Sequence, residues 1–310
     1  MSTSTFFSVI IPTYNRGHLI EKAIESILTQ SYENYEIIVI DNKSTDNTFQ
    51  VLERFIDKNQ IRYYCNSRNY ERSYSRNRGF DESKGEFITL LDSDDILYID
   101  CLKDANDHIL KNKEVQFFHF KIEGVDDNYK PIYKVTYPDA SNPIKGIMMG
   151  NYVSNNAVFY RQDVIKKIHY DETPIMIGIE DYDFVIRVLA ETKHLDRIDK
   201  VNGGVLLHPE RSANLEIWDD TYKRVQYFIN KQISSTEFNV VFGKYKDLFV
   251  SNMNLYLCGF LAVRQKTLGA FKFLIKSLQV YPSIFFTIKF WKHTFIIFKY
   301  AFNSKKLLIK

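Results

Sequence analysis

The feature that most constrains this chain is an apolar segment that ends abruptly in three carboxylates. The run Phe87-Ile88-Thr89-Leu90-Leu91 is followed directly by Asp92-Ser93-Asp94-Asp95. A short apolar run bounded by polar residues predicts a buried strand of a parallel sheet. Ligands of open α/β sheets bind beyond the carboxyl ends of such strands, so we expect these acids to lie at a functional edge.

The spacing of the acids suggests which ligand they bind. Asp92 and Asp94 are two residues apart and offer the oxygen atoms that Mg²⁺ and Mn²⁺ prefer. One or two carboxylates need further oxygens to complete a coordination shell, and a diphosphate supplies them. The pattern therefore predicts a nucleoside diphosphate with a divalent cation. The alternative is structural: the strand ends at a polar turn and an Asp caps the next helix.

The first hundred residues alternate apolar runs with amphipathic ones. Leu19, Ala23 and Ile27 recur with helical spacing in the first amphipathic segment. This alternation predicts βαβ units with right-handed crossovers and a Rossmann-like, doubly wound, mostly parallel sheet of the α/β class. Strands are predicted at 7–11, 35–40, 61–64 and 87–91, and helices at 16–29, 45–58 and 74–83.

The rest of the chain divides into an irregular middle and a helical end. A polar segment at 126–146 is predicted to be a loop, and the chain beyond Trp218 is predicted to be helical throughout. We therefore expect one domain at 1–215 and a C-terminal helical region at 216–310. Between these landmarks we predict helices at 102–110 and 180–192 and strands at 115–122 and 157–160.

Composition limits the class of protein. Hydrophobic residues make up 45% and charged residues 25% of the 310 residues, which is ordinary for a globular protein with a substantial core. Cys65, Cys101 and Cys258 are widely separated, so neither a disulfide framework nor a zinc site is predicted, and a reducing, cytoplasmic compartment is favoured. The first residues show no basic region or cleavage site, so no secretory signal is expected.

Four further motifs lie where a nucleotide site in this topology would need them. Tyr14 follows the first strand and could stack on a base, and Asp41 ends the second strand, where it could accept a hydrogen bond from a pyrimidine N3–H. The basic block Arg72 to Gly79 precedes the acidic run, and guanidinium groups match phosphate in bidentate fashion. Glu180-Asp181 begins a predicted helix, where acids also serve as partners of the helix dipole.

The order of these motifs resembles that of the family 2 glycosyltransferases of GT-A fold. The similarity covers residues 6–215 and comprises S-V-I-I-P-T-Y-N-R, I-D-N-K-S-T-D, R-N-R-G, L-D-S-D-D, E-D-Y-D-F-V-I-R and a histidine followed by a serine. The resemblance implies a GT-A catalytic domain at 1–215 and an inverting transferase that uses a nucleotide-diphosphate sugar, most often a UDP-sugar, with Mn²⁺ or Mg²⁺.

The resemblance also implies roles for individual residues. Asp181 corresponds to the catalytic base, Asp94 to the metal ligand and His208 to a metal or diphosphate contact. Inversion in one displacement requires a carboxylate that removes the acceptor proton while a cation offsets the charge on the leaving diphosphate, which agrees with this assignment. The nucleoside and its phosphates would contact Pro12, Tyr14, Asp41, Arg76, Asp92 and Ser93.

Charge is unevenly distributed along the chain. Residues 251–310 hold ten Lys and Arg and no acid, whereas the first 250 residues hold 31 basic and 38 acidic residues. Aromatic clusters near the C-terminus alternate with lysines, and this pattern predicts a helix in an anionic membrane interface. The alternative is a helical bundle with its lysines outward. The cationic residues that cluster on one helical wheel are Lys289, Lys292, His293 and Lys299.

Together these patterns predict a glycosyltransferase that extends a glycan acceptor, carried on a lipid, in the synthesis of a bacterial surface polysaccharide. We expect it at the inner face of the cell membrane, with no nucleic-acid partner. Two rival hypotheses remain at this point. A nucleotidyltransferase would need a glycine-rich phosphate loop after the first strand, which Pro12 to Arg16 lacks. A non-catalytic nucleotide-sugar-binding module would not need Asp181 or Asp94.

Overall fold

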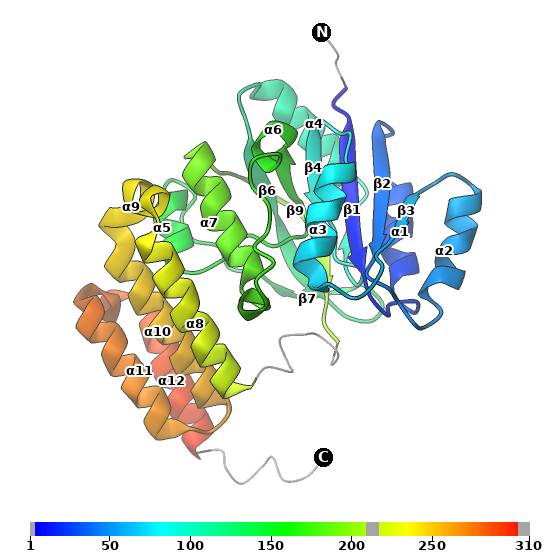
Figure 1. Ribbon diagram of the computed structural model, residues 1–310. Coiled ribbons are helices and arrows are strands. Elements are labelled where there is room, and N and C mark those ends of the chain that lie inside the picture. The colour runs from blue at the N-terminus through cyan, green and yellow to red at the C-terminus, as the bar shows by residue number, and fades with distance from the viewer. Residues whose placement is uncertain (1–3, 209–216, 303–310) are drawn as a thin grey trace. The chain divides into compact units, whose positions relative to one another are not determined.

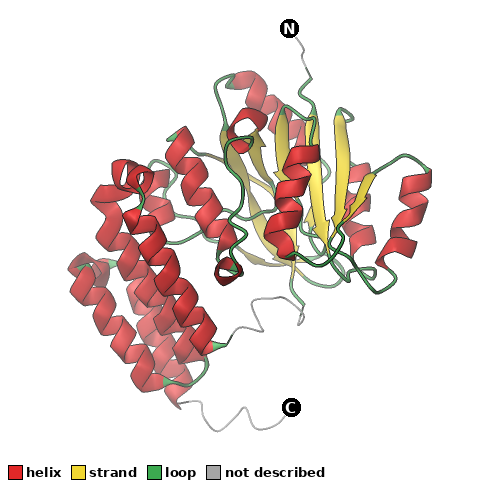
Figure 2. Ribbon diagram, viewed as in Figure 1, coloured by secondary structure: helices red, strands yellow, loops and turns green. Residues whose placement is uncertain are grey.

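The computed structural model describes residues 4–208 and 217–302, which fall into two compact units (Figure 1). Unit 1 comprises the described residues of Met1–Pro143 and Tyr152–Leu215, and unit 2 those of Ile144–Asn151 and Glu216–Lys310. Unit 1 contains the sheet, and unit 2 is helical (Figure 2).

The first half of the sheet in unit 1 is parallel. Strand β1 pairs in parallel with β2 and β4, and β2 pairs in parallel with β3. Every strand and helix predicted in this region is present, although helix α1 begins four residues later than expected, at Ile20 rather than Arg16. The elements are β1 (Phe7–Thr13), α1 (Ile20–Leu28), β2 (Tyr35–Asp41), α2 (Thr48–Asp57), β3 (Arg62–Cys65), α3 (Glu71–Glu82) and β4 (Phe87–Leu90).

The second half of the sheet is largely antiparallel, and the strand order is β3-β2-β1-β4-β8-β6-β9-β5 with β7 paired to β6. Strand β8 is antiparallel to both β4 and β6, and β6 and β9 are parallel. The prediction of a mostly parallel sheet therefore holds for β1–β4, while the α/β class is confirmed. The strands are β5 (Ile96–Leu97), β6 (Phe117–Val125), β7 (Pro131–Lys134), β8 (Val158–Arg161) and β9 (Asp196–Leu206).

Two sequence predictions about this half were incomplete. The segment 126–146, predicted to be a loop, contains β7 and the start of α5 (Pro143–Met148), and β9 was not predicted at all. Helix α7 has the predicted bounds, Glu180–Thr192. The other helical elements of unit 1 are α4 (Cys101–Lys111), α6 (Gln162–Ile165) and η1 (Pro174–Met176).

Close packing around β1 fixes the helix that carries the basic block. Strand β1 is buried along its whole length, and Figure 1 shows α3 lying in front of the sheet. A Cβ atom at Gly79 would lie 2.3 Å from Ile10 Cγ2, so only glycine lets α3 approach β1 this closely. Through this contact α3 is held against β1, and Arg76 lies one helical turn away from the contact.

Unit 2 is a helical bundle around α10, which is buried on most of its circumference. The prediction that the chain is helical beyond Trp218 is confirmed for the described residues. Among them, no helix has both the length and the apolar character that crossing a bilayer requires. The elements are α8 (Trp218–Ser234), α9 (Thr236–Phe242), η3 (Gly243–Tyr245), α10 (Lys246–Val263), α11 (Thr267–Val280), η4 (Pro282–Phe286) and α12 (Ile288–Phe302).

The cationic face predicted for the last helix is divided in the structure. Lys289 lies against the bundle, where its Nζ donates to the backbone carbonyl of Met149, and burial lowers the pKa of Lys289 to about 8. His293 hydrogen-bonds through Nδ1 to the carbonyl of Lys289 at 2.8 Å. Lys292 and Lys299 are exposed. Only part of the predicted cationic face therefore reaches solvent.

Candidate active site

The carboxyl ends of three parallel strands bring the predicted nucleotide-site residues to one edge of the sheet. Thr13 at the end of β1 pairs with Asp41 at the end of β2. The backbone N–H of Leu91 donates to Ile10 in β1, which fixes the start of the acidic run at the same edge. Pro12 is buried, whereas Tyr14 is 42% exposed, so its ring is accessible for stacking.

Asp41 is buried and already hydrogen-bonded. One carboxylate oxygen accepts from the backbone N–H of Ser44 at 2.9 Å, and the other accepts from the Tyr63 hydroxyl at 2.8 Å. Burial and the neighbouring Asp41 raise the pKa of Tyr63, so this tyrosine remains a donor. A carboxylate has about four acceptor sites, and Asp41 can therefore still accept from a base. These contacts hold its carboxylate in place.

Buried amides that sequence reasoning missed order the loop before α3. Asn66 donates from Nδ2 to Asn42 Oδ1 at 2.9 Å and to Ser75 Oγ at 3.1 Å. The backbone N–H of Tyr70 also donates to Asn42 Oδ1. Asn42 and Asn66 are both nearly inaccessible to solvent. They connect the end of β2 to α3, and no local sequence signal distinguishes them from ordinary loop residues.

Arg76 joins the acidic run to the start of α7. Its side chain is 2% exposed, and its two terminal nitrogens lie 3.2 Å from Glu180 Oε1 and 3.1 Å from Asp92 Oδ1. Glu180 is itself buried and also accepts from the backbone N–H of Gly178 at 2.6 Å. Asp92 remains 39% exposed on its side chain, so its carboxylate also faces solvent. The predicted residues Arg76 and Asp92 are therefore in direct contact.

The other acids of the run have different surroundings. Asp94 Oδ2 lies 2.9 Å from His208 Nε2 and 3.9 Å from Arg16 Nη2. Ser93 is buried. Asp95 is also buried and accepts from the backbone N–H of Leu206, which ties the acidic run to the end of β9. Asp95 therefore holds the acidic run against the end of β9, and it helps to bring His208 to Asp94.

The pair Asp94 and His208 offers two possible ligands to a divalent cation. Among the described residues, no group of three or more His, Cys, Asp or Glu side chains is arranged to hold a metal ion. A carboxylate and an imidazole 2.9 Å apart fit a cation whose remaining ligands are water and diphosphate oxygens. The residues present are therefore compatible with a cation that binds together with its nucleotide.

Asp181 differs from its acidic neighbours because no cationic side chain of the described residues is in contact with it. It lies in the first turn of α7 and accepts from the backbone N–H of Tyr182 at 2.7 Å. Burial, together with repulsion from Glu180 and Asp92, raises the pKa of Asp181 to about 6, although Arg76 opposes this. Asp183, in contrast, is buried and forms an ion pair with Arg187 at 2.8 Å. Asp181 therefore has the properties of a general base.

Comparisons with known proteins place this fold and these motifs in a family. Residues 8–176 match the sequence profile of glycosyl transferase family 2. The chain belongs to this family. The fold is the GT-A fold, as the similarity to solved structures shows: TarS of S. aureus, residues 1–349 in complex with UDP-GlcNAc, has a TM-score of 0.68 at 18% identity over 96% of this chain and 89% of that chain.

Two further comparisons, one of structure and one of sequence, show the range of the similarity. The mannosyltransferase PcManGT from Pyrobaculum calidifontis, in complex with GDP-Man and Mn²⁺, has a TM-score of 0.58 at 14% identity, covering 97% of this chain and 88% of that one. The UDP-Glc:alpha-D-GlcNAc-diphosphoundecaprenol beta-1,3-glucosyltransferase WfgD of Escherichia coli is 38% identical over 122 residues. That match spans 39% of this chain and 47% of the relative, less than half of its length.

Proposed function

We propose that this glycosyltransferase transfers a sugar, with inversion, from a UDP-sugar to a hydroxyl of a lipid-linked glycan in the synthesis of a bacterial surface polysaccharide. The name of the E. coli relative describes a UDP-sugar donor and a lipid-diphosphate acceptor, which supports this choice. The observation that carries the proposal is the buried Arg76, which contacts Asp92 on one side and Glu180, beside Asp181, on the other. It connects the donor-binding acids to the candidate base.

The donor would bind at the edge formed by β1, β2 and β4. In this proposal Tyr14 stacks on the base, Asp41 accepts from it, and Pro12 forms the wall behind them. Arg76, Asp92 and Ser93 contact the ribose or the phosphates. Asp94 and His208 would hold Mn²⁺ or Mg²⁺, and the cation would stabilise the charge that develops on the diphosphate.

Asp181 would act as the general base. Its carboxylate takes the proton from the acceptor hydroxyl as the oxygen attacks the anomeric carbon and the bond to the diphosphate breaks. A base with a pKa near 6 is ionised at neutral pH and is still basic enough to assist the attack. Glu180 cannot replace it, because Arg76 and the N–H of Gly178 already engage its two oxygens.

The test separates binding from catalysis. Asp181→Asn should abolish sugar transfer, while calorimetry with UDP and Mn²⁺ should give a donor-site affinity close to that of the unmodified protein. Asp94→Ala should weaken UDP binding with Mn²⁺ but change little in the presence of EDTA. Asp107→Asn, an exposed acid on α4, is the matched control. Full turnover of Asp181→Asn, or metal-dependent binding by Asp94→Ala at unchanged affinity, would refute the assignment.

We also propose that unit 2 attaches the enzyme to the inner face of the membrane. Four apolar residues of α12 are exposed at positions i, i+3, i+7 and i+10, so they share one helix face. Lys292 and Lys299 are exposed beside them and suit anionic headgroups. The exposed apolar residues are Ile288 (88%), Trp291 (51%), Phe295 (66%) and Phe298 (46%).

A vesicle assay tests this attachment. Phe295→Asp should reduce co-sedimentation with phosphatidylglycerol vesicles, because it places a negative charge on the apolar face. Val240→Asp is the control, since Val240 is 75% exposed on α9 and lies outside that face. Equal sedimentation of Phe295→Asp and the unmodified protein would refute attachment through α12. The proposal for the donor site does not depend on that result.

A further inference from the structure

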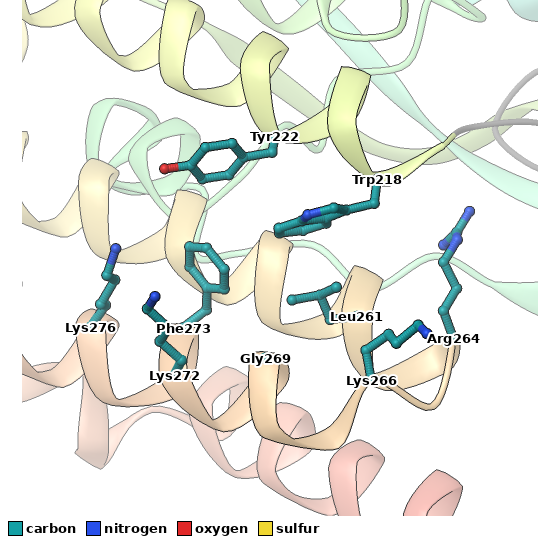
Figure 3. Close-up of a pocket in the computed structure, with 9 residues that line it drawn as sticks. All are labelled: Trp218, Tyr222, Leu261, Arg264, Lys266, Gly269, Lys272, Phe273 and Lys276. Carbon is teal, nitrogen blue, oxygen red and sulfur yellow. The ribbon is translucent and has the colours of Figure 1, made fainter.

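Unit 2 contains a hollow of about 530 Å³ between α8 and α11. Figure 3 shows Trp218 and Tyr222 projecting into it from α8, with Phe273 opposite them on α11. A volume of this size is typical of small-molecule sites, which commonly span roughly 300 to 1,000 Å³. The hollow lies in the unit that contains none of the residues assigned to the donor site.

The charged residues that line the hollow, among those that the structure describes, are all cationic. Lys272 and Lys276 are one turn apart on α11, and Figure 3 shows both amines on the side that faces the aromatic rings. Arg264 and Lys266 lie at the other end, in the connection between α10 and α11. Among the described residues no acid lines the hollow, and none of Lys266, Lys272 and Lys276 forms an ion pair. Four positive charges are thus gathered around one space.

Two acids close to the hollow in sequence do not line it: Asp219 and Asp220 follow Trp218 on α8, and both are exposed. The three lysines repel one another, so the site favours an anion that balances their charge. The central carbon of the Arg264 guanidinium lies 3.5 Å from the ring centroid of Phe260. Its position is therefore fixed by stacking.

The remaining lining is apolar. The rings of Trp218 and Tyr222 are stacked at 5.5 Å, and Phe273 meets Trp218 edge-on at 5.7 Å. Leu261 and Gly269 complete this wall, and a Cβ atom at Gly269 would lie 3.0 Å from Leu261 Cδ1. A glycine at this position keeps the space open. The hollow therefore offers one surface to an anion and another to an apolar group or a sugar ring.

We propose that this hollow binds a phosphate or diphosphate group carried on an apolar chain. Lysine and arginine side chains form charge-assisted hydrogen bonds with phosphate oxygens. The aromatic wall would pack against the carbon atoms of the chain that carries the phosphate. Two sources supply this chemistry: the diphosphate of a lipid-linked acceptor and the headgroup of an anionic phospholipid. The binding site itself does not depend on the proposed transfer reaction, although the first source does.

The two tryptophans of the chain make a direct assay possible. Trp291→Phe leaves Trp218 as the sole tryptophan, so its emission reports on this hollow alone. Saturating UDP and Mn²⁺ occupy the donor site, and the protein is titrated with farnesyl diphosphate, with pyrophosphate and with phosphatidylglycerol vesicles. We expect farnesyl diphosphate to change the emission saturably. Displacement of farnesyl diphosphate by the vesicles would identify the phospholipid headgroup as the source. If the vesicles do not displace it, the source is the diphosphate of the lipid-linked acceptor.

Variants of the cationic residues decide whether the hollow is responsible. Lys272→Gln with Lys276→Gln should weaken farnesyl diphosphate binding by about tenfold or more, which corresponds to at least about 1.4 kcal/mol. Lys244→Gln, which removes an exposed charge of unit 2 outside both the hollow and α12, should leave binding unchanged. Equal affinity of the double variant, no response to either lipid, or pyrophosphate binding as tightly as farnesyl diphosphate would overturn the proposal. UDP calorimetry reports separately on the donor site.

Discussion

Replacing Asp181 by asparagine should make the protein more stable while it abolishes catalysis. The surroundings raise the pKa of Asp181 from 3.8 to about 6, which means that they disfavour the carboxylate. Each pKa unit is worth about 1.4 kcal/mol, so this shift corresponds to a destabilisation of the folded protein by about 3 kcal/mol at neutral pH. The side chain is partly exposed, and solvent screens its charge, so we expect a gain of about 1 to 3 kcal/mol in the free energy of unfolding.

The sign of the pH dependence follows from the direction of the shift. Because the folded-state pKa is above the ordinary value, the folded protein binds a proton between about pH 4 and pH 6 that the unfolded chain has released. The stability of the unmodified protein therefore falls as the pH rises through this interval. Asparagine carries no charge, so the surroundings of residue 181 do not destabilise it in this way. The stabilisation by Asp181→Asn should be complete above about pH 6 and absent below about pH 4.

Urea unfolding followed by far-UV circular dichroism, at about pH 7.5 and about pH 4, measures this difference. Asp183→Asn is the matched comparison on the same helix, and it should destabilise the protein because Arg187 loses its buried partner. From the proposed role of Asp181, sugar transfer should also fall about tenfold for each pH unit below 6 as this carboxylate becomes protonated. Equal stabilities of Asp181→Asn and the unmodified protein at both pH values would refute the argument that its surroundings disfavour the carboxylate.

Three further substitutions test the packing and the ion pairs. Arg76→Met should lower the free energy of unfolding by about 3 kcal/mol, because the buried Glu180 then keeps only Arg72, at 3.7 Å, as a cationic partner. Adding Glu180→Gln should recover part of this loss in urea titrations. Gly85→Ala should cost about 1 to 3 kcal/mol, since a Cβ would lie 2.4 Å from the backbone nitrogen of Ser8; an unchanged melting temperature would contradict this contact. Ser235→Ala should cost about 1 kcal/mol by removing the cap of α9, which thermal unfolding would detect.

The parallel half of the sheet could be predicted because each of its elements has its own local signal. Strand β9 has none: its first half is polar, and it contains Gly203 and Gly204. It forms because it pairs with β6 along most of its length. A Cβ at Gly203 would lie 2.6 Å from Asn156 Oδ1, so these glycines serve close packing rather than a turn. Strand β7 begins with a proline and is exposed, as suits an edge strand, and this composition also suits a loop.

The candidate site shows the same division between local and distant information. Motif order predicted roles for Asp94, His208 and Asp181, and the structure places Asp94 and His208 in contact. The pairing of Arg76 with Glu180 joins residues 104 positions apart, and a single sequence carries no signal for it. That pairing distinguishes two adjacent acids of the same helix turn. Glu180 is neutralised by a buried cation, whereas Asp181 is disfavoured as an anion, and so only Asp181 is suited to accept a proton.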